Sequence, residues 1–454
     1  MKYQLLFKFL AIAAISIVLL MALGSISYKV YERDQYRSEA KASIANGWSG
    51  SQVVVNPVMR VNFSKSYEEE VFDKNLEEYV TRQRTRNWSE WFIPDQLRIH
   101  SEVKMQERYL GIYSIPVYEA TLSMEGEFSK KMVLQKDVRI KSAHLLSSFQ
   151  DMRGISNSPS IVWNGKNVEF QPGDKPQMLG NYIYADISNM KPAEPAKFKM
   201  RIRLRGLDAL NFVPAAKQVV AKVESSWPHP YFEGRYLPTQ REIGEQGFHA
   251  TWELTEFATS VQSAIADCQK SANECATTLY GNTFGVGMHN PIDVYQKTDR
   301  SLKYGFLFIA LTFAAFLLFE VIKRIQIHPI QYGLVGAALA IFYLLLISLS
   351  EHIEFALAYL LAAGACVALI GFYLRSVLGS GSQALMMSAG MGLLYALLYL
   401  ILRSEDFALL MGALLTFASL GALMIFTRKL DWYQLIGKSP ATTEEESEIA
   451  NKPG

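Results

Sequence analysis

Apolar residues gather in six stretches near the two ends of the chain. A long polar segment separates the first stretch from the other five. The stretches are Phe9–Ile26, Tyr304–Ile322, Gly333–Ser350, Phe355–Leu374, Ala384–Leu402 and Phe407–Phe426. Each approaches the ~20 apolar residues that cross the hydrocarbon core as a helix. We therefore expect six membrane-spanning helices, with both termini on the same side.

The first stretch has two interpretations, a retained anchor or a cleaved signal peptide. Lys2 and Lys8 precede it, as both interpretations require. A signal peptide has a shorter apolar core of ~7–15 residues and an A-x-A-like cleavage site. The run is long and Ala22-Leu23-Gly24 is a poor cleavage site, so the pattern favours an anchor.

Charges in the short loops predict the orientation. Basic residues follow the second, fourth and sixth stretches, and acidic residues occupy the alternate loops. Because basic loops stay in the cytoplasm, we expect both termini to be cytoplasmic and residues 28–303 to lie outside. The first flank disagrees, since Lys29, Arg33 and Arg37 would prefer the inside. The three downstream loops together outweigh that flank.

The pattern of the polar segment predicts mostly β-strands. Alternation predicts strands at Gln52–Phe63, Arg98–Glu107 and Lys197–Arg205. Asn164-Gly165 between apolar runs predicts a hairpin. Helical periodicity appears near residues 66–82 and 253–269. The expected fold is a membrane α-helical bundle of six spans. A large periplasmic, mostly-β, sandwich-like α+β domain is inserted between the first and second spans.

These patterns divide the chain into four parts. Residues 1–27 form the cytoplasmic N-terminus and first span, and 28–303 form the periplasmic domain. Residues 304–429 form a bundle of five further helices. The acidic segment 430–454 has little to bury, so we expect it to be disordered in the cytoplasm.

One predicted strand carries a row of basic residues on a single face. The row consists of Lys197, Lys199, Arg201, Arg203 and Arg205. It could dock an anionic partner such as lipid headgroups or a wall polymer. It could also be a solvated face paired with an acidic neighbouring strand. We favour the second interpretation and keep Arg201 and Arg203 as candidate binding residues.

The stretch SSWPHPYFEGRYLP places His229 between Pro228 and Pro230. Proline fixes φ and removes a backbone donor, so this is not a central strand. Four aromatic residues are large enough to cover a sheet edge. The pattern favours a rigid corner, and a ligand-recognition loop is the alternative.

A second polar cluster lies where two spans meet outside. Glu351, His352 and Glu354 could bind a proton, a metal or a partner there. The alternative, which we favour, is a tight polar turn that keeps its charges in water. The centres of the spans carry no charge, and this argues against an ion relay through the bundle.

The chain has three cysteines. Cys268 and Cys275 would lie outside, where a disulfide can persist. Cys366 lies among small residues of the fourth span, which favours a role in close helix packing.

Composition and motifs mainly argue against nucleic-acid binding and against known catalytic or metal sites. The net charge of +2 gives no sign of nucleic-acid binding. No H-x-x-x-H or H-E-x-x-H spacing, G-x-S-x-G elbow or phosphate-binding glycine loop is present. We therefore expect no enzymatic activity and no cofactor or metal.

Several long motifs resemble the CreD family of bacterial inner-membrane proteins, also called cell envelope integrity proteins. They span nearly the whole chain in the same order. They are ERDQYRSEA, DMRGI, WPHP with the following LPTQREI, YQKTDRSLKYGFLFIALTFAAFLLFE, HPIQYGLVGAALAIFYLLLISLSEH and TRKLDWY. The chain departs from the family at Asn56, where the resemblance leads us to expect a glycine before Pro57. The resemblance does not extend to the Cys268/Cys275 pair.

The resemblance implies a role in envelope integrity or the envelope stress response, and it supplies no catalytic residues. Our leading hypothesis is a non-enzymatic protein of the bacterial inner membrane whose exported domain senses, binds or supports envelope components. Its partners would be the lipid bilayer and envelope proteins, lipids or wall components. The alternative is a membrane-bound enzyme or carrier for a lipid-linked or wall-derived molecule, with Glu351, His352, Glu354 and His229 as candidate residues.

Overall fold

The chain forms two compact units, described by a computed structural model that covers residues 2–73, 78–129, 131–173, 180–268, 279–288, 294–323, 327–403 and 408–428. The helical unit holds Met1–Tyr36 and Ile292–Gly454, and the β-rich unit holds Arg37–Pro291. The expected acidic tail lies outside the described residues, and so does Cys275 of the candidate Cys268–Cys275 bridge.

Helices occupy all the apolar stretches in their described residues. They are α1 (Lys2–Gly47), α5 (Val294–Lys303), α6 (Gly305–Lys323), α7 (Pro329–Ser350), α8 (Phe355–Leu378), α9 (Gly381–Arg403) and α10 (Ala408–Thr427). By length and composition, four described helices could each cross a membrane, namely α1, α7, α8 and α9. The pair α5 and α6, bent by 44°, would make a fifth, and α10 contains a shorter apolar segment, Leu410–Ala422. The expected number was six.

Local sequence explains where α7 begins and where α8 ends. The His328 side chain accepts a hydrogen bond from the Ile330 amide, and Pro329 occupies the first turn of α7. Proline suits that position because its missing N–H needs no partner there. After α8, Gly379 takes φ = 60°, a left-handed conformation that ends a helix at little cost for glycine.

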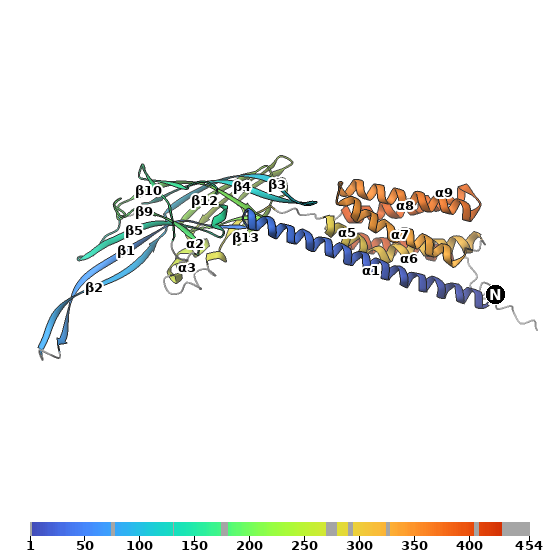
Figure 1. Cartoon of the computed structure of the whole chain (residues 1–454), viewed down its shortest axis with the longest axis horizontal. Helices are drawn as coiled ribbons and strands as arrows, with labels where there is room; N and C mark the ends of the chain where they lie inside the picture. The colour runs from blue at the N-terminus through green and yellow to red at the C-terminus, as the bar shows by residue number, and fades with distance from the viewer. Residues whose placement is uncertain are drawn as a thin grey trace, which may run out of the picture. The chain divides into compact units, whose positions relative to one another are not determined.

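The anchor helix α1 packs on the other helices through glycines. A Cβ added at Gly336 of α7 would overlap Leu19, and one added at Gly305 of α6 would overlap Leu23. Both leucines are buried. Small residues allow this close approach of backbones, which drives helix association in a lipid environment. The helix continues well past the predicted span, for 46 residues in all (Figure 1).

The β-rich unit contains two eight-stranded sheets. The first sheet has the order β13 (Tyr231–Gly234), β16 (Phe284–Gly287), β11 (Ala209–Val213), β1 (Gln52–Asp73), β5 (Val138–Phe149), β9 (Tyr182–Asp186) and β8 (Gln171–Pro172), and β2 (Glu78–Phe92) pairs with β1. The second sheet has the order β14 (Gln240–Gly244), β15 (Gly247–Thr255), β12 (Gln218–Ser225), β3 (Gln96–Leu110), β4 (Tyr113–Phe128), β10 (Ala196–Leu207), β6 (Ser160–Trp163) and β7 (Lys166–Glu169). Both sheets are mixed, because β1 runs parallel to β11 and β3 runs parallel to β12.

Side chains from both sheets form one hydrophobic core. Trp252 of β15 lies 5.5 Å from Phe284 of β16, measured between ring centroids, and so connects the second sheet with the first. Trp163 and Tyr118 are also fully buried. Large aromatic side chains contribute much of the apolar area that stabilises such a core. The unit therefore has the sandwich-like layering that the alternating strands predicted.

Two local predictions are confirmed. Strand β10 alternates between buried and exposed positions, as expected for Lys197–Arg205. Strands β6 and β7 pair across Asn164 and Gly165, which have φ of 45° and 80°. Positive φ at both central residues matches the right-handed twist of the flanking strands.

The two helical predictions have different outcomes. Helices α2 (Glu256–Thr259) and α3 (Val261–Cys268) occupy most of the segment 253–269. The helix predicted at 66–82 is wrong, because its described residues belong to β1 and β2. The strand β1 continues outward from its buried part, and β2 pairs with it residue by residue. Cross-strand pairing overrides the weak local preference of a charged segment.

Candidate functional site

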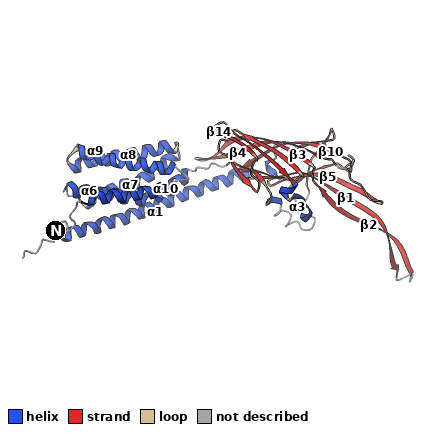
Figure 2. Ribbon diagram, turned by 180° about the vertical axis from the view of Figure 1, so that it is seen from behind, coloured by secondary structure: helices blue, strands red, loops and turns tan. Residues whose placement is uncertain are grey.

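Strands β1 and β2 extend beyond the sheets as a two-stranded ribbon (Figure 1, Figure 2). The pairing between β1 and β5 ends at Lys65, opposite Val138. From there to Asp73, β1 pairs only with β2 among the described strands. We refer to residues 65–73 and 78–86 as the hairpin arm. No described strand covers either of its long edges beyond Lys65.

Arginines line one face of the hairpin arm. Arg82, Arg84 and Arg86 alternate along β2 and are all exposed. Residues two apart on a strand share a face, and their cross-strand partners on that face are Glu69, Tyr67 and Lys65. Glu69 forms an ion pair with Arg84 at 3.0 Å. We refer to Arg82, Arg84 and Arg86 as the arginine face. Over these three pairs, four basic residues meet a single acidic one.

The other face of the arm has the opposite character. Glu68 and Glu70 point to that face, opposite Gln83 and Thr81. Farther out, the rings of Phe72 and Tyr79 contact each other edge-on, with 5.3 Å between centroids. Because successive side chains point to opposite sides of a strand, Glu68 and Glu70 lie across the ribbon from the arginines.

The basic row on β10 is arranged differently. Lys197 and Lys199 lie 3.6 Å and 2.5 Å from Glu127 and Glu125 of β4. Glu119 of β4 lies 3.9 Å from Arg203 and 3.4 Å from Arg205. Arg201 is exposed and faces Ser123 in the register. This row therefore has the solvated, acid-paired arrangement that we favoured from the sequence, which leaves less net charge for an anionic ligand.

The corner around His229 is held by its neighbours. Trp227 Nε1 donates to the His229 carbonyl at 2.9 Å, and the two rings meet edge-on. Trp252 Nε1 donates to the Tyr236 carbonyl at 3.0 Å, and Arg235 donates to Asn282 at 2.8 Å. The His229 side chain itself is exposed. In these contacts, the stretch acts through its backbone, its aromatic rings and the Arg235 side chain.

The turn between α7 and α8 does not arrange its three candidates as a metal site. Glu351 accepts a hydrogen bond from Tyr295 of α5 at 3.1 Å and lies 3.6 Å from Arg33 of α1. His352 and Glu354 are exposed. Within the described ranges, no three His, Cys, Asp or Glu side chains are grouped closely enough to hold a metal ion.

Sequence comparison identifies the family. The family model described as inner membrane protein CreD matches residues 4–433. The chain belongs to the CreD family. Inner membrane protein CreD of Escherichia coli (strain K12) is 30% identical over 458 residues, which cover 99% of each chain. The protein is therefore a multi-pass protein of the bacterial inner membrane, as the resemblance of its motifs led us to expect.

Solved structures give only weak likenesses. Leukotriene A4 hydrolase from Saccharomyces cerevisiae is 12% identical, with a TM-score of 0.20, over 35% of this chain and 27% of that one. An M1 zinc metallopeptidase mutant from Deinococcus radiodurans is 9% identical, with a TM-score of 0.18, over 36% and 38%. Neither likeness bears on the fold or the activity of this CreD chain.

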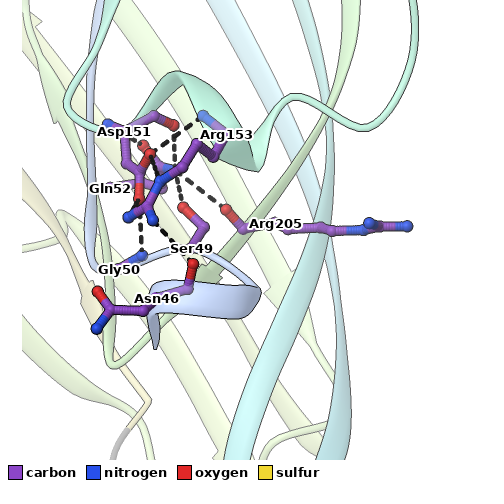
Figure 3. A network of polar contacts seen from close by, with 7 residues as sticks. All are labelled: Asn46, Ser49, Gly50, Gln52, Asp151, Arg153 and Arg205. Carbon is purple, nitrogen blue, oxygen red and sulfur yellow. Dashed lines mark hydrogen bonds and ion pairs between the residues drawn. The ribbon is translucent and has the colours of Figure 1, made fainter. Parts of the chain in front are cut away.

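The DMRGI motif, by which this chain resembles the CreD family, belongs to a polar junction (Figure 3). Asp151 accepts hydrogen bonds from Arg153 Nη2 at 2.7 Å and from the Gly50 amide at 3.2 Å. Arg153 Nη1 also donates to the Asn46 carbonyl, in the last turn of α1, at 2.8 Å. Gln52 Nε2 reaches the carbonyls of Asp151 and Arg205. The motif therefore ties the end of α1 and the start of β1 to β10.

Electrostatic interactions constrain Asp151 of this motif, and the available space constrains Gly154. The hydrogen bonds from Arg153 lower the pKa of Asp151 to about 2, so the carboxylate is ionised at neutral pH. A Cβ at Gly154 would lie 2.4 Å from both the Arg205 carbonyl oxygen and Gln52 Nε2. Only glycine fits there. In this CreD chain, the motif therefore has a structural role, because it holds the end of α1, the start of β1 and β10 together.

Asn56, where the resemblance led us to expect a glycine, has a defined structural setting. The residue is fully buried, and its Nδ2 donates to the Val213 carbonyl at 2.5 Å. It lies where the register between β1 and β5 shifts, between Val55 and Val58. At such a bulge a side-chain amide can pair with a backbone carbonyl of the neighbouring strand β11.

A polar cluster near the start of α1 could not be predicted from the sequence. Lys8 pairs with Glu320 of α6, and Tyr332 of α7 donates to the same carboxylate at 2.8 Å. The side chains of Lys8 and Glu320 are mostly buried, at 16% and 13% exposed. In the sequence, Lys8 only precedes the first apolar stretch, and Glu320 only lies near the end of the second. A separation of 312 residues hides the pair from any local pattern.

Proposed function

We propose that this protein is a binding or scaffold protein that supports the integrity of the cell envelope, and that its β-rich unit binds an anionic envelope component through the arginine face. The supporting observation is the placement of Arg82, Arg84 and Arg86 on one exposed face, where their three register pairs contain a single acidic residue, Glu69. Arginine suits such a role, because its planar fork binds carboxylates and phosphates with two parallel hydrogen bonds.

We further propose the topology expected from the sequence. The chain crosses the membrane six times, both termini are cytoplasmic, and the β-rich unit lies in the periplasm. The basic flank after the first stretch opposes this topology, but the basic residues of the three later loops outweigh it. Arg33 lies 3.6 Å from Glu351, and Lys29 lies 2.6 Å from Glu32. In the structure, each of these two basic residues therefore has an acidic partner within the helical unit.

A protease and a reporter test the topology. In intact spheroplasts, an added protease should degrade the β-rich unit, and a green fluorescent protein fused after residue 454 should fluoresce inside the cell. Protection of the β-rich unit together with a dark fusion would refute this orientation.

The enzyme or carrier alternative gains no support from the geometry. Its candidates Glu351, His352 and Glu354 do not converge, and the Glu351 carboxylate already contacts Tyr295 and Arg33. His229 belongs to the other compact unit. The proposed activity is therefore binding.

Complementation of a strain that lacks the protein tests this function. The variant R82Q/R84Q/R86Q removes three positive charges from the arginine face. The control K197Q/K199Q/R201Q removes three alternating positive charges from the exposed face of β10. At equal protein level in immunoblots, the first variant should leave the envelope permeable to a dye and sensitive to detergent. The control should restore the barrier. Full complementation by the arginine variant would refute the proposed function.

A further inference from the structure

The outer edge of β2 is long and open. The strand has 15 residues and pairs along its whole length with β1. No other described strand pairs with it. The fifteen pairs run without a register shift, and the strand contains no proline. Proteins usually protect such an edge from unwanted pairing by keeping the strand short or by placing a proline, a bulge or charged residues on it. Of these devices, β2 carries only charge.

Between Glu78 and Glu90, the charge on this edge has one sign at regular spacing. Arg82, Arg84 and Arg86 recur every second residue, which places them ~6.8 Å apart on one face. The positions between them, Gln83 and Thr85, are uncharged and point to the other face. Two copies of β2 paired edge to edge would bring arginine rows together, and like charges directly opposite are destabilising. The edge therefore disfavours its own copy and favours an acidic strand.

We propose that β2 accepts an extended acidic segment of a protein partner as an added strand. The segment carries carboxylates at every second position, so that they lie on the same face as Arg82, Arg84 and Arg86. Its intervening side chains are uncharged and lie beside Gln83 and Thr85. This inference rests on the proposed function and names the partner class of the same site.

The open backbone is what favours a polypeptide over other anionic partners. An added strand pairs its own N–H and C=O groups with the edge, and the alternating side chains supply specificity. A lipid headgroup or a polysaccharide can meet the guanidinium groups. Neither offers amide donors and carbonyl acceptors in register with a strand. The arginines would then select a negatively charged partner, and the open backbone of the edge would select a partner in an extended conformation.

Peptide binding to the full chain in neutral phosphatidylcholine nanodiscs tests the proposal. The probe is a fluorescent peptide of alternating threonine and glutamate, and binding is followed by anisotropy. One comparison peptide has the same composition with its glutamates in one block. Another is the alternating peptide with the amides of one edge N-methylated. We expect both to bind at least about tenfold more weakly than the probe.

A charge exchange keeps the test independent of misfolding. The variant R82E/R84E/R86E should lose the acidic probe and gain binding of the peptide with lysine in place of glutamate. The gain would show that its edge is intact. K197Q/K199Q/R201Q should bind the acidic probe like the unchanged protein. Loss of binding in that control, or no gain by the exchanged variant, would overturn the proposal.

Other outcomes separate the inference from the proposed function. The chain could bind the block and N-methylated peptides as tightly as the alternating probe. It could also bind polyphosphate or phosphatidylglycerol vesicles through the arginines but not the probe. Either result would refute strand addition and leave an anion-binding arginine face. If no anionic probe bound the unchanged protein, both the inference and the proposed function would be wrong.

Discussion

Arg33 of α1 and Glu351 at the end of α7 form an ion pair, with 3.6 Å between Arg33 Nε and Glu351 Oε1. Only 9% of the Glu351 side chain is exposed, whereas Arg33 is 47% exposed. Tyr295 donates to the same carboxylate, so three helices meet at one acidic group. The arrangement points to a structural role for the carboxylate.

The first prediction concerns Glu351→Gln. The amide keeps an oxygen for Tyr295 and loses the charge that attracts Arg33. We expect the free energy of unfolding to fall by about 0.2–1 kcal/mol, as for partly exposed ion pairs. Thermal unfolding of the detergent-solubilised chain measures the change, with exposed His352→Ala as the control. A variant at normal protein level that no longer supports the envelope would instead favour the enzyme or carrier hypothesis.

The second prediction concerns the pair of Lys8 and Glu320. Removing one partner leaves the other charge mostly buried, which typically costs about 3–5 kcal/mol. We therefore expect Lys8→Met and Glu320→Gln each to lower the melting temperature strongly. The double variant K8M/E320Q leaves no buried charge without its partner, so its melting temperature should recover part of the decrease. A loss in the double variant equal to the sum of the two single losses would show that the pair does not couple α1 to α6.

The third prediction concerns Asp151→Asn and pH. The pKa of Asp151, about 2, lies below its ordinary value of 3.8. Its carboxylate therefore stabilises the fold fully above about pH 4, and that contribution is lost as the pH falls through about 2. The variant loses the negative charge that strengthens the hydrogen bonds to Arg153, so it should be less stable than the unchanged protein at neutral pH.

Denaturant unfolding from neutral pH down to pH 2 measures this difference. Fluorescence of the fully buried Trp163 and Trp252 reports the state of the β-rich unit. The stability gap between the unchanged protein and the variant should be constant above pH 4 and shrink below it. A gap that did not depend on pH would show that the carboxylate charge contributes nothing.

The fourth prediction concerns Gly154→Ala. The added methyl group would meet the Arg205 carbonyl oxygen, which is backbone and cannot easily move. Overpacking of this kind costs about 1–3 kcal/mol. Gly50→Ala is the matched control, because nothing lies within 4 Å of a Cβ there. Chemical denaturation of both variants should show a loss only at residue 154. Equal stability of the two would mean that the junction is looser than its contacts indicate.

Local patterns predicted the elements whose signals are complete within a few residues. Asn164-Gly165 specifies its own hairpin, and the alternation at Lys197–Arg205 specifies a strand with one buried face. The apolar stretches likewise identify helices by length and composition. Each of these signals needs no information from distant parts of the chain.

Features set by distant pairing escaped the sequence analysis. The segment 66–82 looked helical because its strand character comes from pairing between β1 and β2. The arginine face was missed for the same reason, although the alternation of Arg82, Arg84 and Arg86 is visible once a strand is assumed. The basic row of β10 drew attention instead, and only the register shows that β4 supplies its acids.

The mixed sheets also constrain the order in which the β-rich unit folds. Gln52, at the start of β1, pairs with Leu210 of β11, which in turn pairs with Val286 of β16. A chain emerges from the ribosome with its N-terminal part first. The first sheet therefore has no complete centre until residues beyond 280 have arrived. Slow closure of such distant contacts is the usual cost of this topology. Until then, α1 is complete, but the strands that follow it lack the partner strands with which they pair.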